Sequence, residues 1–304
     1  MNEPEYSNYL FFKITDCNMC GNDSYRVLGR RLNKSQGFNP SGKVGLTTTI
    51  VQCTSCELIY SNPMPIPSSL EDHYNIDPAE YWREDYFKVD ENYFSTEIEW
   101  LKKLTDGKPH LKTLDIGAGL GKQMVALKRA GYEAYGFEPS PAFYSMAKEK
   151  FNFGDEFLKL SSIEDADYSE EFFDFISFGA VLEHLKNPSH SISKAIKWLK
   201  RGGIIHIEVP NSEWLISRLI NKMYKLRGKD YVSNLSPMHP PYHLYEFNLK
   251  SFVKNGQINN YTVIDHTYYV GDTFLPKAIS PLARKLMKNT KTGMQLCVWL
   301  QKKN

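Results

Sequence analysis

The sequence predicts an α/β fold, a doubly wound and mostly parallel sheet of seven strands, preceded by a small cysteine-rich module. Three observations lead to this prediction. Strands alternate with helices from about residue 111 onward, a glycine-rich turn joins the first of these strands to its helix, and two Cys-x-x-C pairs lie near the N-terminus. Strands that alternate with helices form parallel sheets, because each connection has to cross a face of the sheet.

The composition is that of a globular chain. Its 304 residues include 41% hydrophobic and 24% charged residues, which suffices for one large and one small domain. The formal net charge of +2 gives no electrostatic reason to expect a nucleic-acid partner. No stretch approaches the roughly 20 apolar residues of a membrane span, and the acidic N-terminus does not resemble a signal peptide. We therefore expect a cytoplasmic protein.

Two domains are predicted, residues 1–66 and residues 67–304. In the first, residues 44–52 are rich in Thr, Ile and Val and should be extended. A run of three alternating prolines that ends at Pro67 forbids regular structure and marks the boundary. Residues 68–104, which follow, are rich in aromatic side chains and are expected to be helical.

The second domain is expected to begin its alternation at residue 111. Strands are predicted at residues 111–116, 133–137, 157–160, 173–178 and 204–209, and helices at residues 123–130, 141–150 and 189–200. Gly202 and Gly203 are predicted to cap the last of these helices.

The C-terminal part follows a different pattern. A helix at residues 248–255, ended by Gly256, precedes strands at 261–270 and 294–301, with a short helix at 276–288 between them. Two closing strands joined by a short excursion predict an antiparallel edge on the parallel sheet.

An insert is predicted at about residues 211–242, after the fifth strand. Residues 212–228 have apolar and basic stripes side by side and should form an amphipathic helix with Ser212 as its N-cap. A lid helix with a solvated charged face is the favoured interpretation. A cationic rim for an anionic substrate and a membrane-surface helix are the alternatives.

A glycine-rich turn, Asp-Ile-Gly-Ala-Gly-Leu-Gly at residues 115–121, follows the first strand of the second domain. Glycines there allow a tight turn and close approach of a ligand at the carboxyl end of the strand. Glu138 ends the next strand, where a carboxylate can accept both hydrogen bonds from a ribose. The third glycine comes too early for a dinucleotide-binding motif, and Asp115 suits an ammonium group better than a pyrophosphate. A P-loop is excluded because the Gly-Lys-Ser/Thr ending is missing.

Taken in order, these motifs resemble those of the class I methyltransferases that use S-adenosylmethionine (SAM), in particular their small-molecule branch. The resemblance also includes Ser-Ile-Glu at 162–164, the fourth-strand motif at 175–184 and the turn at 198–203. It implies a Rossmann-like methyltransferase domain that binds SAM. The residues implied to bind SAM are Asp115, Gly117, Gly119, Gly121, Glu138, Ser162, Ile163, Phe178 and Tyr81.

Candidate catalytic residues lie in two groups. Glu183 and His184 follow the fourth strand, and His184 is the leading candidate for a general base because an imidazole titrates near neutral pH. His239 and His243 flank two prolines in a loop that can fold over the pocket, so either could share this role or bind substrate. A structural role is the alternative, in which the Glu-His pair only holds two loops together.

The two Cys-x-x-C pairs are Cys17 with Cys20 and Cys53 with Cys56. Four thiolates can close a tetrahedral structural zinc site, and the long spacer can be absorbed as a loop, so residues 1–66 are predicted to form a zinc ribbon. A redox role is the alternative. An N-terminal four-cysteine module before this domain resembles the sugar C-methyltransferases that act on nucleotide-linked deoxysugars.

Together these features predict a methyltransferase that acts on a hydroxyl or carbon of a small polar acceptor, such as a sugar or nucleotide-linked sugar. Carbohydrate or secondary-metabolite biosynthesis is the expected setting. One alternative is an RNA methyltransferase that grips nucleic acid with the zinc ribbon, which the near-neutral charge disfavours. The other is a non-enzymatic SAM-binding scaffold. The sequence is compatible with a monomer or a homodimer.

Overall fold

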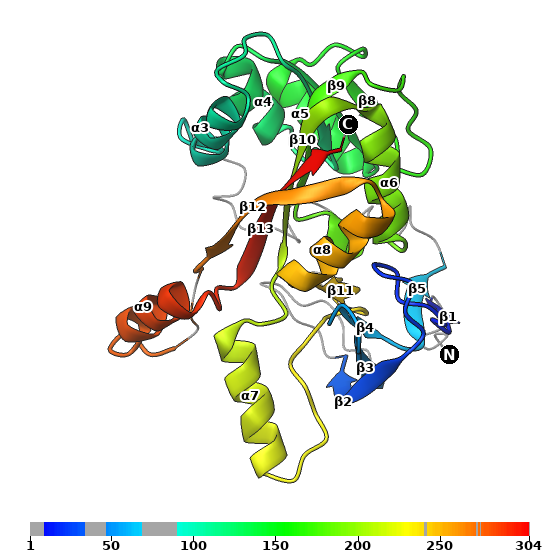
Figure 1. The fold of residues 1–304 in the computed structure, drawn as a ribbon, viewed down its shortest axis with the longest axis vertical. Helices are drawn as coiled ribbons and strands as arrows, with labels where there is room; N and C mark the ends of the chain where they lie inside the picture. Colours follow the sequence, from blue (N-terminus) through cyan, green and yellow to red (C-terminus); the bar gives the residue numbers. More distant parts are fainter. Residues whose placement is uncertain are drawn as a thin grey trace.

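The computed structural model describes residues 9–33, 47–68, 90–239, 242–271, 273 and 275–303. Its centre is a seven-stranded sheet of order β12-β13-β10-β9-β6-β7-β8 (Figure 1). A four-stranded sheet of order β11-β4-β3-β2 and a two-stranded sheet of β1 and β5 lie at the other end of the molecule. The predicted doubly wound, mostly parallel sheet is thereby confirmed.

The parallel part of the large sheet follows the predicted alternation. Its strands are β6 (Lys112–Ile116), β7 (Glu133–Glu138), β8 (Leu158–Leu160), β9 (Phe173–Gly179) and β10 (Leu199–Pro210). The helices between them are α4 (Lys122–Arg129), α5 (Pro141–Phe151) and α6 (Pro188–Trp198), and α3 (Ser95–Leu104) precedes β6. The pairs β6–β7, β7–β8, β6–β9 and β9–β10 are all parallel.

Both faces of this sheet are covered by helices. One hydrophobic cluster contains side chains of α3, α4 and α5, and a second cluster contains side chains of α6 and α8 (Leu249–Ile258). On β9, Phe175 belongs to the first cluster and Ile176 to the second. Successive side chains of a strand point to opposite faces, so the apolar sequence of β9 is the consequence of burial on both sides.

The antiparallel edge predicted for the C-terminal part is also present. β13 (Gln295–Lys302) lies between β10 and β12 (Tyr261–Tyr269) and runs antiparallel to both. Two helices leave this edge of the sheet, α7 (Leu215–Leu226) after β10 and α9 (Ser280–Thr290) after β12. Among the described residues, no helix has the length and apolar character that crossing a bilayer requires.

The N-terminal module is joined to the larger domain by a shared sheet. Its strands are β1 (Tyr9–Phe12), β2 (Tyr25–Leu32), β3 (Thr47–Cys53), β4 (Ile59–Ser61) and β5 (Met64–Pro67). β11 (Tyr245–Glu246), from the C-terminal half of the chain, pairs antiparallel with β4. Buried side chains of the module, such as Met19 and Leu58, belong to the same hydrophobic cluster as Phe178 of β9. The domain boundary at residues 66 and 67 therefore stays a prediction from sequence.

Three predicted helix boundaries are wrong. Gly202 and Gly203 do not cap α6, because β10 begins at Leu199 and contains both of them. Gly202 has a φ of 69° at an irregularity of the strand register, which explains why glycine stands there. Gly256 lies inside α8 and does not end it. α7 begins at Leu215, with Trp214 rather than Ser212 at its N-cap position. Of the helical segment predicted at 68–104, residues 69–89 lie outside the described part.

Gly256 lets α8 pack closely against β12, and its replacement tests this contact. A Cβ at this position would lie 2.7 Å from the backbone oxygen of Tyr261. Gly256→Ala should therefore destabilise the protein by about 1–3 kcal/mol through overpacking. Helix propensity alone would have the opposite sign and stabilise it by up to about 1 kcal/mol.

Urea denaturation of both variants would measure this, with the exposed Gln257→Ala on the same helix as the control. An unchanged or higher stability of Gly256→Ala would contradict the close contact.

Candidate functional site

The glycine-rich turn follows β6 and leads into α4. Gly117, Gly119 and Gly121 have φ values of 67°, 54° and 73°, which other residues rarely adopt. A Cβ on Gly117 would lie 2.7 Å from Cγ2 of Val181, and one on Gly121 would lie 2.5 Å from the ring of Phe153. The backbone conformation favours glycine at all three positions, and close packing adds to this at Gly117 and Gly121.

Glu138, the last residue of β7, ties this turn to the neighbouring strand. One carboxylate oxygen accepts a hydrogen bond from the N–H of Gly119 at 2.7 Å, and the other accepts one from the N–H of Ser140 at 2.9 Å. Burial raises the pKa of Glu138 to about 7, against the lowering effect of these two bonds. Each carboxylate oxygen can accept more than one hydrogen bond, so Glu138 keeps capacity for a hydroxyl-bearing ligand.

Asp115 lies at the same edge of the sheet. It is buried and accepts a hydrogen bond from the hydroxyl of Ser177 at 3.1 Å, while the side-chain amide of Gln123 donates to the same hydroxyl. Burial raises the pKa of Asp115 to about 7, and the charge of Glu138 adds to this effect. Sequence reasoning missed Ser177 and Gln123. The single serine in the otherwise apolar end of β9 was the signal that could have found the first.

A small cavity lies between this turn and the start of α4. It has a volume of about 50 Å³. Its lining includes Tyr93, Asp115, Gly117, Lys122, Gln123 and Gly179. The ammonium of Lys122 lies 4.8 Å from the centre of the Tyr93 ring. The cavity thus combines the predicted glycine turn with an aromatic and a cationic side chain that the sequence had not singled out.

The other residues predicted to bind a cofactor are placed differently. Ser162 and Ile163 follow β8, and the Ser162 hydroxyl donates to Asp165 at 2.7 Å. Ile163 and Phe178 are buried in the hydrophobic cluster that contains α6. These two side chains support the site from within the core, and a direct contact with a ligand stays a prediction. Tyr81 lies outside the described residues.

Glu183, His184 and His243 come together beyond the end of β9. Glu183 and His184 lie in a short 3-10 helix, η3 (Leu182–His184), and the Nε2 atoms of His184 and His243 lie 4.0 and 3.9 Å from Oε1 of Glu183. The second oxygen of Glu183 is buried and has no hydrogen-bond partner among the described residues. The structure therefore assembles three of the four predicted catalytic residues into one cluster.

The proton positions in this cluster follow from burial and hydrogen bonding. Nδ1 of His184 lies 3.2 Å from the backbone oxygen of Tyr242, which can only accept, so Nδ1 carries the proton and Nε2 has a lone pair. Burial lowers the pKa of His184 to about 4 and holds that of His243 well below its usual range. Burial raises the pKa of Glu183 to about 8. At neutral pH both rings are therefore neutral, and the lowered pKa makes His184 a weaker base than the free imidazole on which the sequence argument rested.

His239 is held by the N-terminal module. Its Nε2 lies 3.4 Å from a guanidinium nitrogen of Arg31 on β2, and Arg31 also donates to the backbone oxygen of Leu235 at 2.9 Å. Burial lowers the pKa of His239 to about 4, and the positive charge of Arg31 adds to this effect. Arg31 was not predicted from sequence. It connects the N-terminal module to the loop that contains two of the candidate histidines.

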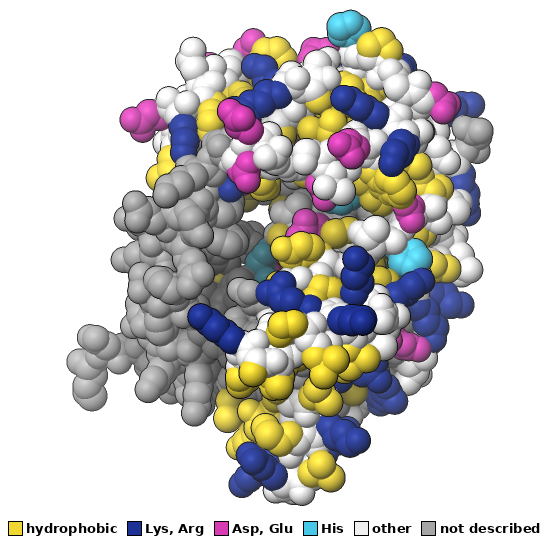
Figure 2. All heavy atoms as spheres, turned by 90° about the vertical axis from the view of Figure 1, so that its left-hand side faces the viewer, with side chains coloured by type: hydrophobic (Ala, Val, Ile, Leu, Met, Phe, Trp, Pro, Cys, Tyr) yellow, Lys and Arg dark blue, Asp and Glu magenta, His cyan; other side chains and the backbone are white. Residues whose placement is uncertain are grey.

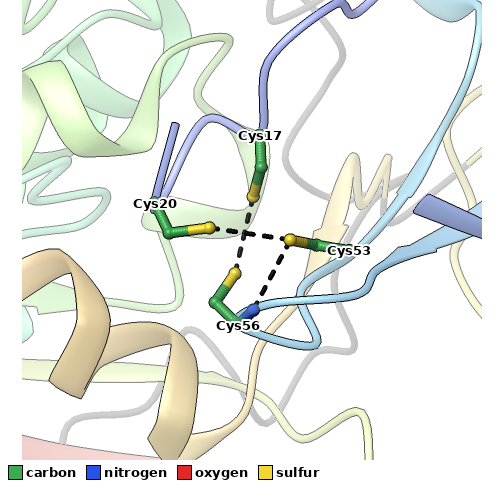
Figure 3. Close-up of side chains that lie close together, drawn as sticks. All are labelled: Cys17, Cys20, Cys53 and Cys56. Atoms are coloured by element: carbon green, nitrogen blue, oxygen red, sulfur yellow. Dashed lines mark hydrogen bonds between the residues drawn. The ribbon is translucent and has the colours of Figure 1, made fainter. Parts of the chain in front are cut away.

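The four cysteines of the N-terminal module form a compact cluster (Figure 3). Sγ of Cys17 lies 3.5 Å from that of Cys56, and Sγ of Cys20 lies 3.6 Å from that of Cys53. All four are free thiols, and the N–H of Cys56 points at Sγ of Cys53 at 3.5 Å. The contact with Cys53 and burial raise the pKa of Cys17 to about 12.

This donor set fits a tetrahedral divalent cation. Zinc binds thiolates at about 2.3 Å, which separates tetrahedral sulfurs by about 3.8 Å, close to the observed spacing. A bound cation would also reverse the cost of ionising these buried thiols.

Comparisons with known proteins agree with the fold. Residues 89–266 match the family model described as methyltransferase domain. A ubiquinone biosynthesis O-methyltransferase of Nitrobacter winogradskyi is 30% identical over 107 residues, 34% of this chain and 40% of that protein. An uncharacterized protein of Methanocaldococcus jannaschii is 28% identical over 146 residues, 48% of this chain and 65% of that protein. The chain thus spans less than two thirds of either relative.

A solved structure shows the same fold. The crystal structure of magnesium protoporphyrin IX methyltransferase from Synechocystis PCC 6803 with bound SAH aligns with a TM-score of 0.52 at 16% identity. The alignment covers 77% of this chain and 98% of that one. At this identity the likeness concerns the fold of the domain.

The buried carboxyl of Glu183 should make stability depend on pH. A free Glu titrates near 4.3, whereas Glu183 titrates at about 8 in the fold. Between these values the folded protein keeps a proton that the unfolded chain has lost, so stability falls as pH rises and levels off above about pH 8. Glu183→Gln removes this pH-dependent contribution to the free energy of unfolding. From about pH 6.5 to about pH 8.5, wild type should lose about 2 kcal/mol more than the variant.

Denaturation curves at both pH values would measure the difference, with the exposed Glu170→Gln as the control. Identical pH dependence of wild type and Glu183→Gln would show that the carboxyl is not held protonated.

Proposed function

This chain belongs to the methyltransferase-domain family, and we propose that it transfers a methyl group from SAM to a small polar acceptor. The observation that carries the proposal is the hydrogen bond that the N–H of Gly119 donates to the carboxylate of Glu138, at the carboxyl ends of β6 and β7. In open α/β sheets this edge is where ligands bind. The residues matched by the family model, 89–266, include this turn.

Two buried carboxyls give the site its preference for SAM. A hydroxyl pair of a ribose can donate to the remaining lone pairs of Glu138, and a cationic amino acid group suits Asp115. Both carboxyls have pKa values raised to about 7. A ligand with positive charge would stabilise their ionised forms. SAM, when bound, supplies an electrophilic methyl group on its sulfonium.

The cluster of Glu183, His184 and His243 is proposed to handle the acceptor. Methyl transfer is an in-line displacement, so the protein mainly has to position the acceptor atom. The lone pair on Nε2 of His184 can take the proton that a hydroxyl or carbon acceptor loses as its new bond to the methyl carbon forms. His243 of this cluster and His239, which contacts Arg31, are proposed to bind or orient the acceptor.

The acceptor class is proposed to be a sugar or a nucleotide-linked sugar. The four-cysteine module before the domain, like that of sugar C-methyltransferases, supports this class. The name of the Nitrobacter relative, an O-methyltransferase, supports oxygen as the acceptor atom. Methylation on oxygen and on carbon both require the base that the histidine cluster supplies.

Cys17, Cys20, Cys53 and Cys56 are proposed to hold a structural zinc ion. Four protein ligands would close the coordination sphere and leave no position for a substrate, as in other structural zinc sites. The cluster lies where β3, the turn before β4 and the N-terminal loop meet, so the metal would stabilise the module that supplies Arg31.

Calorimetric titration with S-adenosylhomocysteine tests the cofactor. Wild type should bind with micromolar affinity, and Glu138→Ala should bind at least about 10-fold more weakly, because hydrogen bonds to a charged group are worth about 1.5–3 kcal/mol. Glu133→Ala, at the opposite end of the same strand, is the matched control and should bind like wild type. Absence of binding to wild type would refute the SAM-dependent methyltransferase proposal.

Metal analysis tests the zinc site. The purified protein should contain one zinc ion per chain, and Cys56→Ser should lose it and unfold at a lower temperature, since the metal contributes to folding. Cys297→Ser is the control, because Cys297 is buried on β13 away from the cluster. Zinc absent from wild type, or retained by Cys56→Ser, would argue against a four-cysteine site.

A further inference from the structure

Two helices at one edge of the sheet expose apolar side chains to solvent. On α7 the exposed apolar residues are Leu219, Met223 and Leu226, the last of them 79% exposed. On and beside α9 they are Ile279, Leu282 and Leu286, with Leu282 72% exposed. In α7 only Ile216 and Ser217 are buried, and in α9 only Met287. Most of the surface of each helix thus faces away from the rest of the protein.

The same helices concentrate positive charge. Residues 214–229 contain five basic side chains and no acidic one, and residues 276–291 contain another five and no acidic one. The basic residues are Arg218, Lys222, Lys225, Arg227, Lys229, Lys277, Arg284, Lys285, Lys288 and Lys291. The whole chain has a net charge of only +2. The rest of the chain therefore has a net negative charge, and the two helical segments hold a local excess of basic side chains.

The topology brings the two helices to the same edge. β10 and β12 both run antiparallel to β13, so they end on the same side, and α7 and α9 follow these ends. The backbone N–H of Leu215, at the start of α7, donates to the oxygen of Thr292, just beyond α9, at 3.2 Å. In Figure 1 both helices project away from the large sheet, α9 to the left and α7 downward. Figure 2 shows hydrophobic and basic side chains intermingled over the corresponding part of the surface.

We propose that α7 and α9 together form a docking surface for an anionic lipid bilayer. Amphipathic helices with a basic polar face and exposed leucines lie in the membrane interface, where the leucines enter the acyl boundary. Lysine and arginine side chains next to them are attracted to anionic headgroups. Binding of this kind is peripheral, and it needs no membrane-spanning helix.

The charge on this surface decides between possible occupants. A second copy of this chain docked symmetrically would bring the same basic helices against each other, and like charges in contact are repelled. A nucleic acid would match the charge but leaves the exposed leucines without a partner. An anionic bilayer satisfies both the charged and the apolar side chains. The proposal does not depend on methyl transfer.

Co-sedimentation of the full chain with lipid vesicles tests this surface. The protein should bind vesicles of phosphatidylcholine mixed with phosphatidylglycerol at least about 10-fold more strongly than vesicles of phosphatidylcholine alone, and high salt should weaken the binding. The double variant Leu226→Ser with Leu282→Ser should lose at least about 10-fold in affinity. The double variant Lys222→Gln with Lys225→Gln should lose vesicle affinity to a similar extent. These side chains are exposed or at the helix surface, so the thermal transition should be unchanged.

Leu160→Ser and Lys159→Gln on β8 are the matched controls, since both residues are exposed and β8 is the outermost strand on the side of the sheet away from β12. Binding of the control variants should equal that of wild type. No binding of wild type to the anionic vesicles would overturn the proposal, and so would equal binding by wild type and the helix variants. Sedimentation velocity adds a further test: self-association that the helix variants abolish, without vesicle binding, would assign the surface to a second copy and also overturn it.

Discussion

The parallel pairing of β6 with β7 and β9 is the constraint on which the rest of the site depends. In this register Asp115 lies beside Gly136 on one neighbour and beside Ser177 on the other. The three strands therefore end at the same level, which brings Glu138 to the glycine turn and directs the segment after Gly179 past it. A slip of one residue in either pair would turn these side chains to the other face of the sheet. Because every residue from Phe173 to Phe178 is buried, burial alone does not fix this register, and the hydrogen bond from Ser177 to Asp115 is a contact that depends on it.

Burial of carboxyl groups at this edge gives the site its chemical character. Asp115, Glu138 and Glu183 are all buried there, and burial raises the pKa of each to about 7 or 8. The three carboxyls differ in how many hydrogen bonds offset the cost of their burial. Glu138 accepts two backbone N–H groups and Asp115 accepts a serine hydroxyl, whereas one oxygen of Glu183 has no partner among the described residues. Such uncompensated polar groups are costly in a core and are found mainly where a ligand or reaction uses them.

How much could be predicted from the sequence depended on how local each signal was. The strands, the glycine turn and the antiparallel edge were predictable because periodicity and turn chemistry act over a few residues. Gly256 was misjudged because its reason, close approach to Tyr261, is a tertiary contact. The pairing of β11 with β4 and the contact of Arg31 with His239 join segments far apart in the chain, and a two-residue strand has no periodicity to detect. Gln123 was missed for the same reason: its role appears only once β9 places Ser177 beside it.

The antiparallel pairing of β13 with β10 and β12 explains why α7, α9 and β11 all follow the carboxyl ends of the strands. Had the last two strands continued the parallel pattern, their connection would have required a crossover helix over a face of the sheet. Because β13 reverses direction between β10 and β12, the chain after β12 emerges at the same edge as the chain after β10. α7, α9 and β11 therefore follow the carboxyl ends of the strands, where the glycine turn and the histidine cluster also lie. The strands form a rigid scaffold, and the connections at their carboxyl ends can vary in length and sequence without disturbing the sheet. In this chain those connections attach a cysteine module through β11 and two basic helices through α7 and α9, so the residues proposed to handle the acceptor and those proposed to bind a membrane surface follow the carboxyl ends of the same sheet.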